Sequence, residues 1–143
     1  MKSAQVILLL VLGLAGASMP AASEDKPVVA MIGTGTLAST FGPAIGRAGY
    51  PLVYGSRDPA RSSVSELVGK SGAGASADSP RKATSKAQIV ILAVPRKVLD
   101  EVTDGLGDLD GKIVVDVSGG MKRVAADGYL ELIPGESNSE RIQ

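Results

Sequence analysis

The sequence predicts a single-domain α/β protein with a doubly wound parallel sheet. Short apolar runs bounded by turn residues recur along the 143-residue chain, as is typical of strands buried on both faces. Helix-like segments separate these runs, and such alternation makes the strands parallel, with helices on both faces of the sheet. Aromatic residues are only 3% of the chain while glycine occurs 18 times, so the core must be aliphatic and tightly packed.

Five strands are expected in this domain. They are residues 27–32, 52–55, a weak segment near 74–76, then 88–94 and 113–117. Helices are expected at about 37–48, 58–68, 79–86 and 97–102. In the first helix, Leu37, Phe41, Ile45 and Ala48 recur at helical spacing, which predicts that they form the buried face. Pro43 lies inside that helix and is expected to kink it.

Composition and charge exclude several classes of function. Fifteen basic and fifteen acidic side chains give no net charge, which argues against a nucleic-acid partner. The chain has no Cys and no His, so disulfides, cysteine nucleophiles, serine–histidine triads and His-based zinc sites are excluded. We therefore assign no catalytic side chain and no metal site from the sequence.

The first 23 residues have the pattern of a secretory signal peptide. Lys2 precedes the apolar run Val6–Leu14, and small residues follow at 15–18 and 21–23. The apolar run is shorter than the ~20 residues of a transmembrane helix, so no stable membrane span is expected. The interpretation is a leader at 1–23, a domain at 24–143 and a periplasmic or secreted protein. A buried N-terminal strand is the alternative.

A glycine-rich turn joins the first expected strand to the first expected helix. Its pattern is Gly33-x-Gly35-x-x-Ala38. In a Rossmann-type domain the first glycine permits the tight turn, the second lets the backbone approach a pyrophosphate, and the third position packs the helix on the strand. The pattern alone is weak, but its place after the first strand favours dinucleotide binding over a structural turn.

The end of the second expected strand favours NADP over NAD. An NAD site carries an acidic residue there for the ribose 2′-hydroxyl, whereas this chain has Gly55-Ser56-Arg57, with Arg61 following. A guanidinium can hold a 2′-phosphate through charge-assisted hydrogen bonds. Two alternatives stay open: the arginines line a solvated helix start, or Asp58 is the ribose carboxylate.

Four segments support a resemblance to a known family. Residues 29–35 together with Tyr54–Pro59 resemble the NADP-binding domain of deazaflavin (coenzyme F420)-dependent NADP reductases. Residues 91–95 and 112–116 are similar to two later strands of that family, and the resemblance covers about 28–117. The cytosolic domain of six-transmembrane ferric-chelate reductases is similar too.

The resemblance implies a cofactor site built from four segments. The pyrophosphate would lie along Thr34, Gly35, Thr36 and Leu37, after the turn at Gly33. The 2′-phosphate would be held by Ser56, Arg57 and Arg61, and the riboses would lie over Ala93, Val94 and Pro95. The loop that begins at Ser118 would approach the nicotinamide, where family members usually carry Asn-Pro and this chain has Gly119-Gly120.

The function expected from these features is hydride transfer between NADPH and a small acceptor such as a flavin or deazaflavin. Alternatives are a non-catalytic NADP-binding module, an exported pseudoenzyme, and an imine or keto-acid reductase that lacks its substrate domain. The closing residues suggest a helix start, with Ser137 as the cap and Glu140 three residues later. We interpret the chain as a fragment that binds nucleotide but turns over poorly. A minimal domain completed as a homodimer is the rival interpretation.

The leader interpretation gives a first prediction. Protein recovered from its native compartment should lack residues 1 to about 23, because a signal peptide is removed during export. Intact-mass measurement of that protein checks the prediction. Retention of Met1 or Lys2 on soluble intracellular protein would contradict export.

Overall fold

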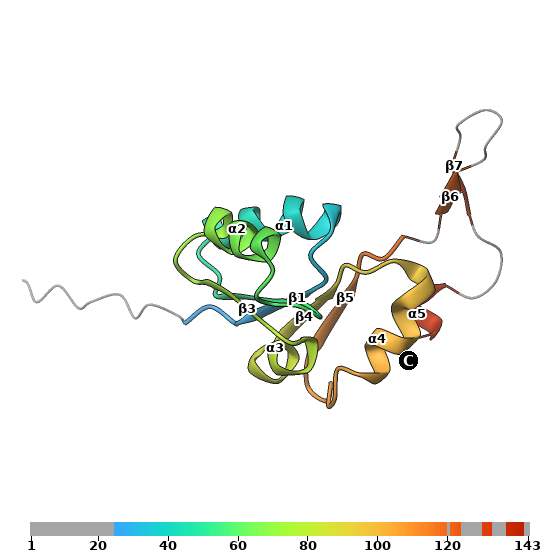
Figure 1. Cartoon of the computed structure of the whole chain (residues 1–143). Coiled ribbons are helices and arrows are strands. Elements are labelled where there is room, and N and C mark those ends of the chain that lie inside the picture. The colour runs from blue at the N-terminus through green and yellow to red at the C-terminus, as the bar shows by residue number, and fades with distance from the viewer. Residues whose placement is uncertain (1–24, 120, 124–129, 133–136, 142–143) are drawn as a thin grey trace, which may run out of the picture.

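A computed structural model describes residues 25–119, 121–123, 130–132 and 137–141 of the chain. The expected leader, residues 1–23, lies outside these described residues. From Asp25 the chain runs directly into the first strand, and the described core is one α/β unit (Figure 1).

The core is a parallel sheet whose strands run in the order β3-β2-β1-β4-β5. Every pair of neighbours in it is parallel and in register, so that Val29 of β1 lies between Leu52 of β2 and Ile89 of β4. This order is that of a Rossmann-type doubly wound domain, and the predicted fold class is confirmed. The strands are β1 Val29–Ile32, β2 Leu52–Gly55, β3 Ala75–Asp78, β4 Ile89–Leu92 and β5 Ile113–Asp116.

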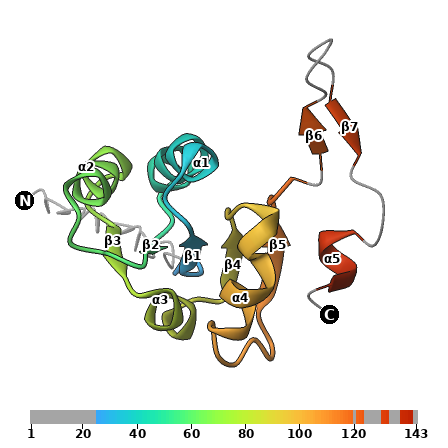
Figure 2. The same ribbon diagram turned by 45° about the vertical axis from the view of Figure 1, so that its right-hand side comes forward.

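Helices cover both faces of the sheet, as Figures 1 and 2 show. Helices α1 (Thr36–Arg47) and α2 (Ser62–Ser71) lie on one face, and α3 (Pro80–Lys86) and α4 (Leu99–Asp104) lie on the other. A single 3-10 turn, η1 (Arg96–Val98), precedes α4. The helix expected at 58–68 begins only at Ser62, because residues 58–61 form a turn closed by the Arg61 amide on the Asp58 carbonyl.

Each face of the sheet has its own apolar core. Side chains alternate along each strand, so neighbouring residues of β1 enter different cores. Ala30 and Ile32 pack with Leu99 on the α3/α4 face, whereas Met31 packs with Ala38 on the α1/α2 face. All four residues of β1 are buried, which is why its sequence is uniformly apolar rather than alternating.

The predicted buried face of α1 is wrong for Leu37, Phe41 and Ala48, which are exposed, and Ile45 is partly buried. Leu37 and Phe41 are 41% and 44% exposed, whereas the buried residues of this helix are Ala38, Gly42 and Pro43. Gly42 has to be small because a Cβ there would lie 2.6 Å from the Tyr54 ring carbon Cζ and would overlap the hydroxyl oxygen. Small residues thus bring α1 close to β2, and the helix continues through Pro43 as one element.

The ring of Tyr54 connects three elements on this face. Tyr54 is fully buried on β2, and its hydroxyl is hydrogen-bonded to the Ser71 hydroxyl of α2 at 2.7 Å. The Ser71 hydroxyl also donates to the Leu67 carbonyl at 2.8 Å. Burial raises the pKa of Tyr54, although the hydrogen bond to Ser71 opposes this shift. Tyr54 therefore stays neutral and fixes how closely α1 and α2 pack on the sheet.

The last sheet strand, β5, forms an open edge within the described residues. Ile113 is 62% exposed, and Val114 and Val115 are also exposed. Beyond β5, strands β6 (Met121–Arg123) and β7 (Leu130–Leu132) form a separate antiparallel pair. No helix of the described part is long and apolar enough to cross a membrane.

A short helix, α5 (Asn138–Arg141), follows this hairpin and confirms the predicted capping pair. The Ser137 amide donates to the Glu140 carboxylate at 2.7 Å, and the Glu140 amide donates to the Ser137 hydroxyl at 3.2 Å. These two hydrogen bonds form a reciprocal capping box. They also lower the pKa of Glu140.

Two helical glycines should respond to alanine in opposite directions. Gly42→Ala should destabilise the domain by about 2–3 kcal/mol, because the new Cβ would overlap Tyr54 between packed elements. Gly69→Ala in α2 is the matched control, since its Cβ would meet no atom within 4 Å and alanine favours helix by about 0.5–1 kcal/mol. Denaturant unfolding of both variants tests the contrast. Equal effects of the two substitutions would contradict this account of α1 packing.

Candidate functional site

A cavity of about 570 Å³ opens at the carboxyl edge of the sheet. It lies where the strand order reverses. Strands β2 and β3 follow β1 on one side of the sheet, and the chain then crosses to β4 and β5 on the other side. Ligands of doubly wound proteins bind at such a switch point. The lining residues are Ile32, Gly33, Thr34, Gly35, Gly55, Ser56, Arg57, Asp58, Arg61, Pro80, Ala93, Val94, Pro95, Val98, Glu101 and Val102.

Gly33 makes the turn that forms the floor of this cavity. Its φ of +110° is strained for any residue with a side chain, and its amide donates to the Gly55 carbonyl at 2.9 Å. A Cβ at this position would lie 3.0 Å from the Ala93 carbonyl carbon and closer still to its oxygen. Gly33 is therefore required by the backbone of β1 and β4, whatever the cavity binds.

Gly35 has a different environment from Gly33. Its φ of −85° is accessible to any residue, and a Cβ there would meet no protein atom within 4 Å. Gly35 is the N-cap of the twelve-residue helix α1, which has no side-chain cap and no acidic residue in its first turn. Free N–H groups at such a helix start favour a bound anion.

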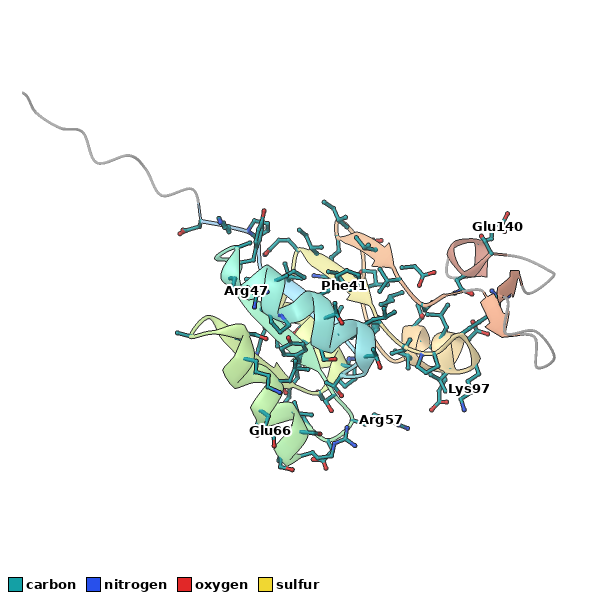
Figure 3. The ribbon with its side chains drawn as sticks, turned by 90° about the horizontal axis from the view of Figure 1, so that it is seen from above. Phe41, Arg47, Arg57, Glu66, Lys97 and Glu140 are labelled. Carbon is teal, nitrogen blue, oxygen red and sulfur yellow. The ribbon has the colours of Figure 1, made fainter. Side chains whose placement is uncertain are left out.

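The end of β2 is shaped by a serine turn. The Ser56 hydroxyl donates to the Asp58 carbonyl at 3.1 Å and accepts from the Asp58 amide at 3.2 Å. This turn leaves Arg57 exposed beside the cavity, and Figure 3 shows it far from Arg47 at the other end of α1. In the described part of the chain, neither Arg57 nor Arg61 forms an ion pair. Both guanidinium groups are therefore available to an anionic ligand.

The beginning of α3 closes the cavity behind β2. The Asp78 carboxylate at the end of β3 accepts from the Ser79 amide at 2.8 Å and from the Lys86 ammonium at 2.9 Å. The hydrogen bond from Lys86 and the one from Ser79 lower the pKa of Asp78. Asp78 thus stays ionised and holds the turn that brings Pro80 to the cavity.

The cavity brings together most of the residues predicted for the site. It is lined by Gly33, Thr34, Gly35, Ser56, Arg57, Arg61, Ala93, Val94 and Pro95. Thr36, Leu37 and Ser118 are not among its lining residues. A role for any of these residues in cofactor binding stays a prediction.

Ser118 lies instead in a buried polar cluster at the end of β5. Its hydroxyl donates to the Asp116 carboxylate, and Asn138 donates to the Ser118 carbonyl and hydroxyl at 2.7 and 2.8 Å. Arg96 donates in turn to the Asn138 side-chain oxygen. Asn138 thereby ties α5 to the loops after β4 and β5. The sequence contained no local signal for this role, because the partners lie 20 and 42 residues away.

The last residue of η1 and the helix α4 supply a wall of the cavity that was not predicted from the sequence. Val98, Glu101 and Val102 line it. Their i, i+3, i+4 spacing puts them on one side of a helix, so a shared face could have been inferred from that spacing. Among the described residues, no group of three or more His, Cys, Asp or Glu could hold a metal ion.

Solved structures of reductases resemble this fold. A protein assigned as an F420-dependent NADP-reductase from Arthrobacter sp. FB24 matches with a TM-score of 0.68 and 24% identity, over 82% of this chain and 57% of that one. An imine reductase from Streptomyces aurantiacus matches with a TM-score of 0.54 and 26% identity, over 64% and 31% of the two chains. Pyrroline carboxylate reductase from Plasmodium falciparum, solved with NADP bound, matches at 0.53 and 16%, over 68% and 35%.

The chain thus spans little more than half the length of the first of these proteins and about a third of the other two. A family model described as "NADP oxidoreductase coenzyme F420-dependent" matches residues 28–120, from β1 through the end of β5. Because this match covers more than half of the chain, the protein belongs to the family of coenzyme F420-dependent NADP oxidoreductases.

Proposed function

We propose that the cavity at the carboxyl edge binds NADP(H) and that the protein exchanges hydride between this nucleotide and a flavin or deazaflavin. The observation that carries the proposal is the pairing of an open helix start at Gly35 with Arg57 and Arg61, which line the same cavity and form no ion pair with any described residue. Family membership supports NADP(H) as the nucleotide and a deazaflavin as the acceptor.

The residues present fit the two phosphate-bearing parts of NADP. The space at Gly35 that a Cβ would fill leaves room for a pyrophosphate against the N–H groups of α1. Arg57 and Arg61 border the same cavity from the β2 side, where a 2′-phosphate would lie. Asp58 also borders it, and its carboxylate would repel a 2′-phosphate rather than hold it. We assign Arg57 as the main ligand of the 2′-phosphate.

The segment that follows β4 would lie under the riboses of the nucleotide. Ala93, Val94 and Pro95 line the cavity there with apolar side chains, and none of the three can act as an acid or a base. Bound nicotinamide itself supplies or accepts the hydride, so the chain needs to position the ring and exclude water rather than transfer a proton. A site that only positions the nicotinamide needs no catalytic side chain, and we assign none.

Export would place this site in the periplasm or outside the cell. That localisation, like the leader on which it rests, is part of the proposal. A non-catalytic NADP-binding module in that compartment is the competing function, and the two differ only in turnover.

Arg57 should determine the preference for NADPH over NADH. Arg57→Ala should remove most of this preference, with a loss of about 1.5–3 kcal/mol in NADPH binding, because a charge-assisted contact to the 2′-phosphate is lost. Isothermal titration with both nucleotides measures the effect. Arg47→Ala is the control, since this arginine lies at the far end of α1 (Figure 3). Equal affinities of the unmodified protein for NADPH and NADH would refute the assignment.

Turnover separates the reductase from the binding module. The 143-residue chain should bind NADPH but oxidise it only slowly with a free flavin or deazaflavin. The described residues that follow β5 include no wall over the nicotinamide end of the cavity, and such a wall positions an acceptor. Stopped-flow absorbance of NADPH with each acceptor is the measurement. Oxidation well above the uncatalysed rate and linear in protein concentration would contradict this prediction.

A further inference from the structure

The wall formed by η1 and α4 combines two valines with one carboxylate. Val98, Glu101 and Val102 border the cavity, while Leu99 turns away and is fully buried in the core of the α3/α4 face. The Thr103 hydroxyl donates to the Leu99 carbonyl at 2.7 Å and reinforces the helix at this point. The core thus fixes which face of α4 borders the cavity, and Glu101 belongs to that face.

Glu101 is exposed at the cavity, and the ligand group that contacts its carboxylate has to be a hydrogen-bond donor. Glu101 and Asp58 are the two acidic residues that line the cavity, and the described chain gives Glu101 no ion pair. The phosphates of a dinucleotide are anions and would be repelled by Glu101, so they must lie toward Gly35 and the arginines. The two valines suit the face of an aromatic base, and a carboxylate can only accept hydrogen bonds.

We propose that Glu101 recognises the adenine base of the nucleotide by accepting a hydrogen bond from its exocyclic amine. The proposal rests on the proposed NADP(H) site and adds a specificity residue to it. The base lies against Val98 and Val102, beyond the ribose whose 2′-phosphate meets Arg57. Glu101 then discriminates against bases that carry a carbonyl oxygen where adenine carries its amine.

Deamino-NADPH is the probe that isolates this contact. Its base is hypoxanthine, which has a carbonyl in place of the adenine amine and a proton on the neighbouring ring nitrogen N1. The group at the amine position is therefore an acceptor facing the Glu101 carboxylate. The unmodified full chain should bind NADPH about tenfold more tightly than deamino-NADPH, as expected for loss of one hydrogen bond to a charged group at an exposed site. Titration of the chain with each nucleotide at equal ionic strength gives this ratio without any substitution.

Two substitutions and one control then assign the ratio to Glu101. Glu101→Ala should bring the two affinities to within about twofold of each other. Glu101→Gln should also do so, because an amide can accept from the amine or donate to the carbonyl. Asp104→Asn removes an exposed carboxylate of the same helix that does not line the cavity, and it should leave the tenfold ratio unchanged.

The results distinguish the role of Glu101 from the NADP(H) site on which that role rests. Equal binding of both nucleotides by the unmodified chain, or a ratio that survives Glu101→Ala, overturns the role of Glu101 while the NADP(H) site stands. Tighter NADPH binding by Glu101→Gln also overturns it, because the carboxylate then only repels the phosphates. If neither nucleotide binds, the proposed function itself fails, and the role of Glu101 fails with it.

Discussion

The close approach of two backbones at Gly33 is the constraint on which the rest of the molecule depends. The turn after β1 passes against the Ala93 carbonyl at the end of β4, and its amide is bonded to the Gly55 carbonyl at the end of β2. One residue thus fixes the ends of three neighbouring strands relative to one another. The cavity exists because these three ends meet at the same edge while the helices that follow them diverge to opposite faces.

The two glycines of the turn have separable roles, which a motif alone does not reveal. Gly33 satisfies the fold, since both its φ and its contacts exclude a side chain. Neither constraint applies to Gly35, so its lack of a side chain matters only for what enters the cavity. Ser56, like Gly33, serves the fold, because its hydroxyl is hydrogen-bonded to the main chain of Asp58 in the turn that exposes Arg57. The surroundings of the site are therefore built by the fold, whereas Gly35, Arg57 and Arg61 remain open to a ligand.

The strand pattern was enough to predict the parallel sheet, and the turn motif with the end of the second strand predicted Gly33, Gly35, Arg57 and Arg61 at the cavity. The family resemblance, rather than the pattern, implied Ala93, Val94 and Pro95. Apolar runs report burial directly, and the topology of a doubly wound sheet then determines which strand ends meet. The buried face of α1 was mispredicted because periodicity weights large apolar residues, whereas this helix packs through Ala38 and Gly42 against Tyr54. The cluster around Asn138 was beyond sequence reasoning, since it joins residues distant in the chain through side-chain geometry. Glu101 was missed because one acidic residue on a short helix is usually a solvated one.

Among the described residues β5 has an open edge, and this edge affects how molecules of the protein meet one another in solution. Ile113 and Val115 share one side of the strand, and they continue the surface formed by Ile89 and Ile91 on β4. Edge strands with apolar side chains attract other chains at short range. Charged proteins oppose such encounters by long-range repulsion, but this chain has no net charge at pH 7 and a pI near 6.2. Colloidal stability should therefore improve at pH values well above the pI, where net negative charge keeps the exposed edges apart.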